Sequence, residues 1–273
     1  SGGLHGVGGS VVNALSAWLR VEVRQNGKVY QQKYERGIPQ TTLEVIGEAD
    51  TTGTIIHFLP DAEIFETILF DSELISHRLR ELAFLNKGLE IRAADLRSGT
   101  SETYHFEGGV VEFVAFLNEG RNSLHADPIY LEGERDGVSV EIAMQYNDSY
   151  QESVFTYANN IKTVEGGTHL IGFRAALTTT INSYATREDL LKGVKFALSG
   201  EDAREGLTAV VSVKLPEPQF EGQTKSKLGN SDVKGLVQSL TSEALSMYMA
   251  EHPDVAKRVI LKIIEAGRAR DAA

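Results

Sequence analysis

Apolar and polar positions change their period several times along the first sixty residues, and each change marks an expected element. A run at helical spacing, with Ser10 as its N-cap, predicts a helix over residues 10–18. The apolar positions of this run are Val11, Val12, Leu15 and Leu19. The period becomes two on both sides of Asn26-Gly27, which predicts a β-hairpin over residues 20–32. A further strand is expected at residues 54–59.

The pattern then predicts a helix followed by a strand and a second, shorter helix. The first helix is capped by Ser72 and ended by Gly88. Its buried stripe consists of Ile75, Leu79, Leu82 and Leu85. A strand at residues 89–93 and a helix at residues 110–117 follow. A polar, turn-rich stretch comes next, so we expect a domain boundary near residue 126.

Strands and longer helices fill the second half of the chain. The expected elements are strands at 138–146, 150–157 and 209–213, a helix after Gly166-Gly167, a capped turn at 199–202, and two final helices of which the second starts at Pro253. The helix after Gly166-Gly167 has a stripe formed by Leu170, Phe173, Leu177 and Ile181. The last helix reaches Ala273 without a glycine or proline stop, so we expect either that it is cut there or that it frays.

Composition narrows the class of protein. The chain has 273 residues, of which 41% are apolar and 24% charged, as in an ordinary globular protein of one or two domains. It has no cysteine, which excludes disulfides, thiolate zinc sites and a cysteine nucleophile. No apolar run approaches the roughly 18 residues of a membrane helix, and no signal-peptide pattern occurs. We therefore expect a cytoplasmic protein with no membrane association.

The charge argues against a stand-alone DNA-binding module. The net charge is −11, and neither half of the chain is basic: residues 1–126 hold 11 basic and 17 acidic side chains, and residues 127–273 hold 16 and 21. Affinity for nucleic acid depends largely on lysines and arginines that neutralise phosphates. These counts leave a basic patch on one part of the surface as an open alternative.

The glycine loop, residues 2–9, is the first candidate for chemistry. It reads Gly-Gly-Leu-His-Gly-Val-Gly-Gly and leads into the first expected helix. Glycines let the backbone approach a ligand closely, and free amides at a helix start attract anions. The loop matches neither the dinucleotide fingerprint nor the P-loop, so phosphate binding and a simple turn both stay open. Because the loop stands at the start of the chain, we expect the rest of a nucleotide pocket to precede it.

The lysine loop, residues 216–230, is the second candidate. It connects an expected strand to an expected helix and contains Gln223, Thr224 and Lys225. Connections of this length inside a compact domain are usually functional or disordered. A lysine ammonium suits a terminal phosphate, and a glutamine can orient a water molecule. Two solvated surface lysines, Lys225 and Lys227, are the competing interpretation.

Other candidates carry weaker signals. Thr54 lies beside an expected turn, and its hydroxyl is suited to hydrogen bonding with a buried base. Arg174 on the helix after Gly166-Gly167 either faces solvent or lines a groove for a polyanion. The seven histidines are scattered, and no metal set or nucleophile–base arrangement emerges from their spacing.

Several motifs together resemble one family along the whole chain. They are Gly2-Gly3-Leu4-His5-Gly6-Val7-Gly8, Ser10-Val11-Val12-Asn13-Ala14-Leu15-Ser16, Thr52-Gly53-Thr54, Arg80-Glu81-Leu82-Ala83-Phe84-Leu85-Asn86, Glu165-Gly166-Gly167-Thr168-His169, Gly172-Phe173-Arg174, Asp202-Ala203-Arg204-Glu205-Gly206-Leu207 and Gln223-Thr224-Lys225. They resemble the gyrase B family of bacterial type II topoisomerases. The corresponding topoisomerase IV subunits share most of these motifs, and both groups are type IIA topoisomerases.

The resemblance implies an α+β fold in two domains. Residues 1–126 would be the later part of a GHKL (Bergerat-type) ATP-binding α/β sandwich. Residues 127–273 would be a transducer domain of the ribosomal-protein-S5-domain-2-like fold. The implied function is that of the ATP-hydrolysing subunit of a DNA topoisomerase, which couples ATP binding to closure of a DNA clamp, strand passage and negative supercoiling.

The resemblance also assigns site residues and ligands. The backbone amides of Leu4, His5, Gly6, Val7 and Gly8 would surround the phosphates of ATP. Thr54 would help to hold adenine. Gln223 and Lys225 would reach the γ-phosphate from the transducer, and Arg174 would face the cavity that takes double-stranded DNA. The implied cofactors are ATP and Mg²⁺, and the implied partners are DNA, the gyrase A protein and a second copy of the same subunit on ATP binding.

Parts of the family pattern are expected outside this chain. The catalytic glutamate, the magnesium-binding asparagine and the adenine-binding aspartate would precede Ser1, as would the arm exchanged between subunits. The C-terminal metal-binding domain would follow the chain. The resemblance therefore implies that the isolated chain is an inactive fragment, whereas its parent is an enzyme.

Two alternatives accompany this interpretation. In the first alternative, the parent protein of this chain is a topoisomerase IV subunit. In the second, it is another protein with the same ATP-binding fold, such as a mismatch-repair protein, a chaperone or a histidine kinase. The motif Glu165-Gly166-Gly167-Thr168-His169 and the transducer lysine Lys225 argue against the second alternative.

Overall fold

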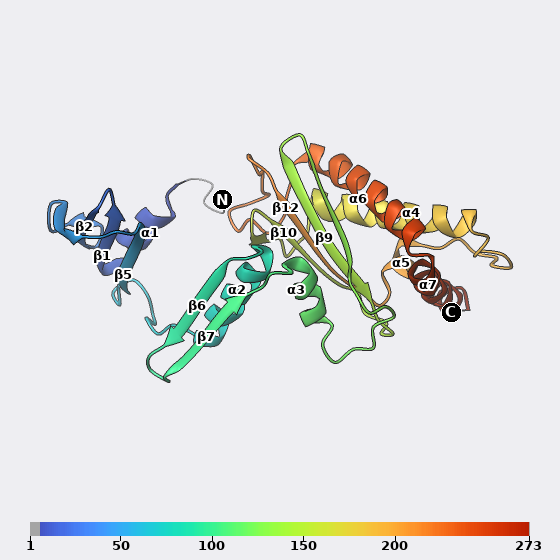
Figure 1. Ribbon diagram of the computed structural model, residues 1–273, viewed down its shortest axis with the longest axis horizontal. Helices are drawn as coiled ribbons and strands as arrows, with labels where there is room; N and C mark the ends of the chain where they lie inside the picture. Colours follow the sequence, from blue (N-terminus) through green and yellow to red (C-terminus); the bar gives the residue numbers. More distant parts are fainter. Residues whose placement is uncertain (1–5, 273) are drawn as a thin grey trace. The chain divides into compact units, whose positions relative to one another are not determined.

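The computed structural model describes residues 6–272, which separate into two compact units, residues 6–75 and residues 76–272. We call them the N-terminal unit and the C-terminal unit (Figure 1). Both combine helices with largely antiparallel sheets, so the predicted α+β class is confirmed. None of the helices in the described part of the chain is both long and apolar enough to cross a bilayer.

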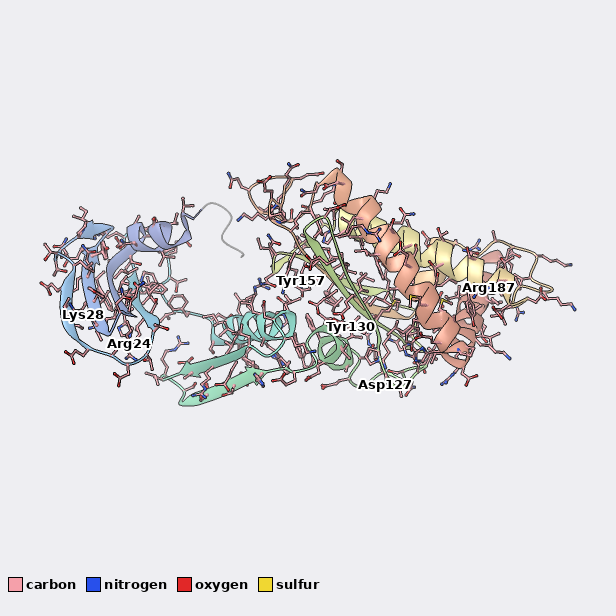
Figure 2. The ribbon with its side chains drawn as sticks, turned by 45° about the horizontal axis from the view of Figure 1, so that its top comes forward. Arg24, Lys28, Asp127, Tyr130, Tyr157 and Arg187 are labelled. Atoms are coloured by element: carbon pink, nitrogen blue, oxygen red, sulfur yellow. The ribbon has the colours of Figure 1, made fainter. Side chains whose placement is uncertain are left out.

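The N-terminal unit is a twisted sheet with one short helix. Its elements are α1 (Gly8–Ala14), β1 (Ser16–Gln25), β2 (Lys28–Glu35), β3 (Ile38–Pro39), β4 (Glu44–Glu48) and β5 (Gly53–Pro60). The strands follow the order β3-β2-β1-β5, and β4 also pairs with β2. The predicted hairpin is confirmed, since Asn26 and Gly27 have φ angles of 53° and 75°, as a type I′ turn requires. Figure 2 labels Arg24 and Lys28 on its two strands.

The helix predicted over residues 10–18 is wrong in its bounds. It starts at Gly8 and ends at Ala14, and Ser10 lies inside it rather than at its cap. The next residues form β1, in which Trp18 is paired with Leu59 and Leu19 with Tyr34. The helical spacing of the apolar residues is therefore overridden, because strand pairing on both sides of β1 satisfies the backbone groups of these residues instead.

The segment after β5 leads through α2 (Ser72–Leu85) into the C-terminal unit. The predicted helix is confirmed, but its cap is Asp71 rather than Ser72. The Asp71 carboxylate accepts hydrogen bonds of 3.0 and 3.1 Å from the amides of Glu73 and Leu74. The hairpin of β6 (Glu90–Asp95) and β7 (Thr100–His105) and the helix α3 (Val110–Leu117) follow.

A second five-stranded sheet forms the centre of the C-terminal unit, in the order β11-β10-β12-β9-β8. Its strands are β8 (Ile129–Arg135), β9 (Val138–Tyr146), β10 (Ser153–Ala158), β11 (Ile161–Lys162) and β12 (Leu207–Lys214). Its helices are α4 (Thr168–Arg187), α5 (Gly200–Arg204), α6 (Ser231–Glu251) and α7 (Pro253–Ala272). Strands β10 and β12 are parallel, and α4 and α5 lie in the crossover between them. The predicted strand over residues 138–146 coincides with β9, while β8 was not predicted.

Helices cover both faces of this sheet (Figure 1), and an apolar core lies on each face. The larger core lies between the sheet and α4, α6 and α7. On the other face, α2 and α3 pack against Ala143, Tyr157 and Val210 of the sheet. Phe84 of α2 stacks on Phe113 of α3 with ring centroids 4.7 Å apart. Packing thus joins α2 and α3 to the second sheet, and the domain boundary near residue 126 stays a prediction.

Candidate nucleotide site

The glycine loop leads into the first turn of α1. Leu4 and His5 lie outside the described residues. Gly6 has a φ of 65°, and Gly6, Val7 and Gly8 are all exposed. A Cβ placed on Gly6 or Gly8 would meet no atom of the described residues within 4 Å, so these residues leave the space beside this backbone open. The first bond of the helix runs from the Val11 amide to the Val7 carbonyl over 2.9 Å, which leaves the amides before Val11 without an acceptor inside the helix.

A cavity of about 400 Å³ lies beside α1 in the same unit. It is lined by Val11, Val12, Leu15, Ser16, Phe58, Pro60, Phe65, Thr67, Ile68, Leu69 and Phe70. The lining is almost wholly apolar, and the volume is in the range of small-molecule pockets. The cavity was not predicted, because the segment over residues 65–70 shows neither helical nor strand periodicity. Only the fold brings this segment to α1 and β5.

Thr54 lies on the strand that forms one wall of this cavity. It stands four residues before Phe58 on β5, so both side chains project from the same face of the strand. Thr54 is exposed, and its backbone is paired with Val23 of β1. The N-terminal unit therefore presents open glycine amides, a threonine hydroxyl and an apolar cavity, a combination suited to a ligand with a flat apolar part and an anionic part.

The lysine loop lies between β12 and α6 in the C-terminal unit. Gln223 is exposed and Lys225 is half-buried with a φ of 54°. The two lysines of the loop differ in their partners. Lys227 pairs with Glu221 at 2.9 Å, whereas no ion pair to Lys225 occurs between residues 6 and 272. The Lys225 ammonium is therefore not neutralised by any described carboxylate.

Arg174 on α4 is held by an ion pair. Its guanidinium contacts the Glu152 carboxylate, which also pairs with Arg204 at 3.1 Å. The Arg174 side chain keeps 40% of its surface exposed. Part of its charge is therefore satisfied locally, and its role toward DNA stays a prediction.

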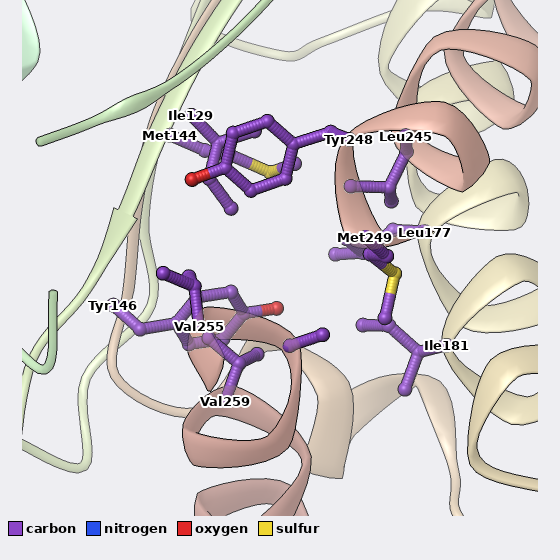
Figure 3. Close-up of a pocket in the computed structure, with 11 residues that line it drawn as sticks. Ile129, Met144, Tyr146, Leu177, Ile181, Leu245, Tyr248, Met249, Val255 and Val259 are labelled. Carbon is purple, nitrogen blue, oxygen red and sulfur yellow. The ribbon is translucent and has the colours of Figure 1, made fainter. Parts of the chain in front are cut away.

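A small void lies inside the core of the C-terminal unit (Figure 3). Its volume is about 10 Å³, and apolar side chains from β8, β9, α4, α6 and α7 surround it. This space holds at most one water molecule, so it is a packing defect rather than a ligand site. The described residues also contain no group of three or more histidine or acidic side chains arranged to hold a metal ion.

Similarity to known proteins agrees with the resemblance in sequence. Residues 109–273 match the DNA gyrase B protein family. The chain is 55% identical to the DNA gyrase B protein of Halalkalibacterium halodurans and 56% identical to that of Clostridium acetobutylicum, in each case over its whole length. It spans 43% of the length of both relatives.

Solved structures of two enzymes share the fold. The 43K ATPase domain of Thermus thermophilus gyrase B, in complex with an aminocoumarin, aligns with a TM-score of 0.87 at 41% identity, covering 98% of this chain and 73% of that one. The ATP-binding domain of Francisella tularensis topoisomerase IV, in complex with a small-molecule inhibitor, aligns with a TM-score of 0.83 at 30% identity, covering 97% and 73%.

Proposed function

Since the chain belongs to the DNA gyrase B family, we propose that it forms part of the ATP-hydrolysing subunit of a type IIA DNA topoisomerase. In this function ATP binding and hydrolysis drive closure of a clamp around DNA, strand passage and negative supercoiling. The observation that carries the proposal is the Lys225 ammonium, which stands in a long loop without a carboxylate partner among the described residues.

The N-terminal unit would bind the nucleotide. The amides of Leu4, His5, Gly6, Val7 and Gly8 would donate to the phosphate oxygens, because the space beside the described glycines is open. Thr54 would hydrogen-bond the adenine, with the apolar cavity on the same face of β5. ATP supplies the phosphoanhydride bond whose cleavage releases the free energy for DNA movement.

Gln223 and Lys225 would act on the terminal phosphate. Transfer of a phosphoryl group to water relies on positioning and on charges directed at the oxygens of the transferred group. The Lys225 ammonium would neutralise the charge that develops there, and the Gln223 amide would donate a further hydrogen bond. The glutamate that would activate water and the asparagine that would hold Mg²⁺ are assigned to parts of the relatives that this chain does not span, since it covers 43% of their length.

The partners follow from the same proposal. The subunit would pair with a second copy on ATP binding, join the gyrase A protein and enclose double-stranded DNA near Arg174, in the cytoplasm. Residues 1–126 would belong to the ATP-binding domain, and residues 127–273 would form the transducer. Topoisomerase IV is the second candidate, but the alignment with its solved domain has the lower identity, 30% against 41% for gyrase.

Substitution of Lys225 tests the proposal in the full-length protein assembled with its partner. Lys225→Ala should lower the ATPase rate about 100-fold, the usual effect of removing one donor to a transition-state charge. Lys227→Ala is the matched control, because Lys227 is already paired with Glu221, and it should change the rate less than about twofold. An ATPase rate for Lys225→Ala within a few fold of the wild type would contradict the assigned role.

The chain by itself is expected to be inactive, because it spans only 43% of its relatives. Purified residues 1–273 with ATP and Mg²⁺ should show no turnover and little thermal shift. A shift of several degrees would show instead that the glycine loop and the cavity bind the nucleotide without further segments.

A further inference from the structure

The lysine loop forms backbone hydrogen bonds with the segment that leads into α4. Leu228 of the loop forms a parallel bridge with Gly167. The Leu228 amide donates to the Gly166 carbonyl at 3.1 Å, and the Thr168 amide donates to the Leu228 carbonyl at 3.0 Å. Just before this bridge, the Glu165 amide donates to the Ser226 carbonyl at 2.9 Å. The last residues of the loop are thus paired like a short strand with residues 165–168.

A side-chain contact strengthens this pairing next to Lys225. The Ser226 hydroxyl donates a hydrogen bond to the Glu165 carboxylate. Ser226 is buried, with 8% of its surface exposed, whereas Glu165 is exposed, so water is excluded from the hydroxyl but still reaches the carboxylate. Since Ser226 directly follows Lys225, its hydroxyl sets the position of the backbone from which the lysine side chain starts.

The base of the loop is also fixed. Asn230 accepts a hydrogen bond of 2.6 Å from the Gln219 amide and donates one of 3.1 Å to the Glu217 carbonyl. The Glu221 amide donates to the Lys227 carbonyl at 2.9 Å. These hydrogen bonds connect the two ends of the loop to each other. The segment between them, which carries Gln223 and Lys225, is therefore held at both of its ends.

The Glu165 carboxylate accepts a hydrogen bond from Ser226 and forms no ion pair with Lys225. No ion pair to Lys225 is found in residues 6–272. The acidic side chain therefore orients the loop without neutralising the ammonium group that the loop presents. A direct Glu165–Lys225 pair would hold the loop but would lower the charge available to a phosphate.

We infer that Glu165 is a positioning residue, which fixes Lys225 through the Ser226 hydroxyl so that the ammonium meets the terminal phosphate of ATP. This inference rests on the proposed function. Residues 165–168 continue directly into α4, so the same contacts link the position of Lys225 to the first turn of that helix. Displacement of a catalytic group by about 1 Å costs up to 100-fold in rate.

The test compares ATPase kinetics of variants in the full-length protein assembled with its partner. Glu165→Ala and Ser226→Ala should each lower kcat about 10-fold and leave the KM for ATP within about twofold, because the lysine is misplaced while the glycine loop is unchanged. Glu165→Gln keeps an oxygen that accepts from Ser226, so it should retain most of the activity. Glu221→Ala removes a loop carboxylate that pairs with Lys227 and not with Ser226, and it should leave kcat unchanged.

A double substitution separates positioning from a general structural role. Glu165→Ala added to Lys225→Ala should lower kcat no further, because the residue acts only through the lysine. An additional loss in the double variant, or a parallel loss of kcat and of ATP affinity in Ser226→Ala, would overturn the inference. Wild-type kcat in both Glu165→Ala and Ser226→Ala would overturn it too. Failure of the proposed function is distinct, since it would appear as an active Lys225→Ala variant.

Discussion

The Tyr157 hydroxyl on β10 donates a hydrogen bond of 2.7 Å to the Glu81 carboxylate on α2. Glu81 is 5% exposed and also receives a 2.8 Å bond from Arg78, with the Lys162 ammonium 3.6 Å away. Burial by itself would raise the pKa of Glu81, but the hydrogen bonds from Tyr157 and Arg78 and the charge of Lys162 outweigh it and lower the pKa. This ionised carboxylate joins α2 to the sheet of the C-terminal unit.

Tyr157→Phe should lower the free energy of unfolding by about 1–2 kcal/mol, because the substitution removes one donor from a buried carboxylate. The effect should be present at neutral pH. It should shrink under acid conditions, since a carboxyl group whose pKa is lowered in the folded state loses its stabilising contribution as the pH falls through that pKa. Urea unfolding at several pH values measures the change. Tyr150→Phe, at an 83% exposed position, is the control and should be neutral.

The burial of His169 leads us to expect a second dependence of protein stability on pH. Its ring is fully buried, Nε2 lies 2.9 Å from the Thr163 hydroxyl, and Nδ1 has no hydrogen-bond partner among the described residues. Burial lowers the pKa of His169 to about 4. His169 takes up a proton near pH 6.5 in the unfolded chain but only near pH 4 in the folded chain. The contribution of neutral His169 to the free energy of unfolding is therefore complete above pH 6.5, and it falls by roughly 3 kcal/mol as the pH is lowered toward 4.

The measurement for His169 is urea unfolding between pH 4 and 7 together with an NMR titration of the ring signals. Burial lowers the pKa of His125 as well, so the comparison with His169→Gln isolates the share of His169. The slope of stability against pH should be smaller in this variant. A ring signal of His169 that titrates near pH 6.5 in the folded protein would contradict the prediction.

Gly167→Ala should separate the lysine loop from the start of α4. Gly167 has a φ of 137°, and a Cβ there would lie 2.3 Å from the Leu228 carbonyl oxygen, closer than any real contact. We expect a loss of at least about 2 kcal/mol in stability together with a lower ATPase rate. Gly235→Ala is the matched control, because no atom of residues 6–272 lies within 4 Å of its Cβ position inside α6. It should be neutral or stabilising by up to about 1 kcal/mol. Equal stabilities of the two variants would be inconsistent with this close backbone approach.

Asn118→Ala tests the polar network behind the turn-rich stretch before residue 126. The Asn118 side chain donates to Gln145 at 2.8 Å and accepts from Asn147 at 3.0 Å and from Thr208 at 2.8 Å, all of them buried. Its removal takes one donor from Gln145 Oε1 and one acceptor from the Thr208 hydroxyl, while Asn147 keeps a 3.4 Å bond to Thr208, so we expect a loss of about 3 kcal/mol in urea unfolding. Asn122→Ala, at an exposed position, should cost less than about 0.5 kcal/mol. Similar losses for both variants would argue that the network contributes little.

Turn and cap chemistry could be predicted where the deciding residues are neighbours in the chain. Asn26-Gly27 supplied two residues that tolerate positive φ, and the capped turn expected at residues 199–202 is present, where Ser199 and Asp202 form a capping box at the start of α5. The helix over residues 10–18 was predicted with wrong bounds because Trp18 and Leu19 pair with strands that lie far along the sequence. Local periodicity does not contain that competition.

The amino-acid sequence by itself determined the helices and strands of an α+β fold, the glycine and lysine loops and the family motifs. Each of these depends on residues within a few positions of each other. Tertiary structure decided the rest. The cavity beside α1, the contact of Glu165 with Ser226 across 61 residues and that of Glu81 with Tyr157 across 76 join distant segments. Their geometry follows from packing and burial, which no local pattern encodes, so these contacts appear only once the chain is folded.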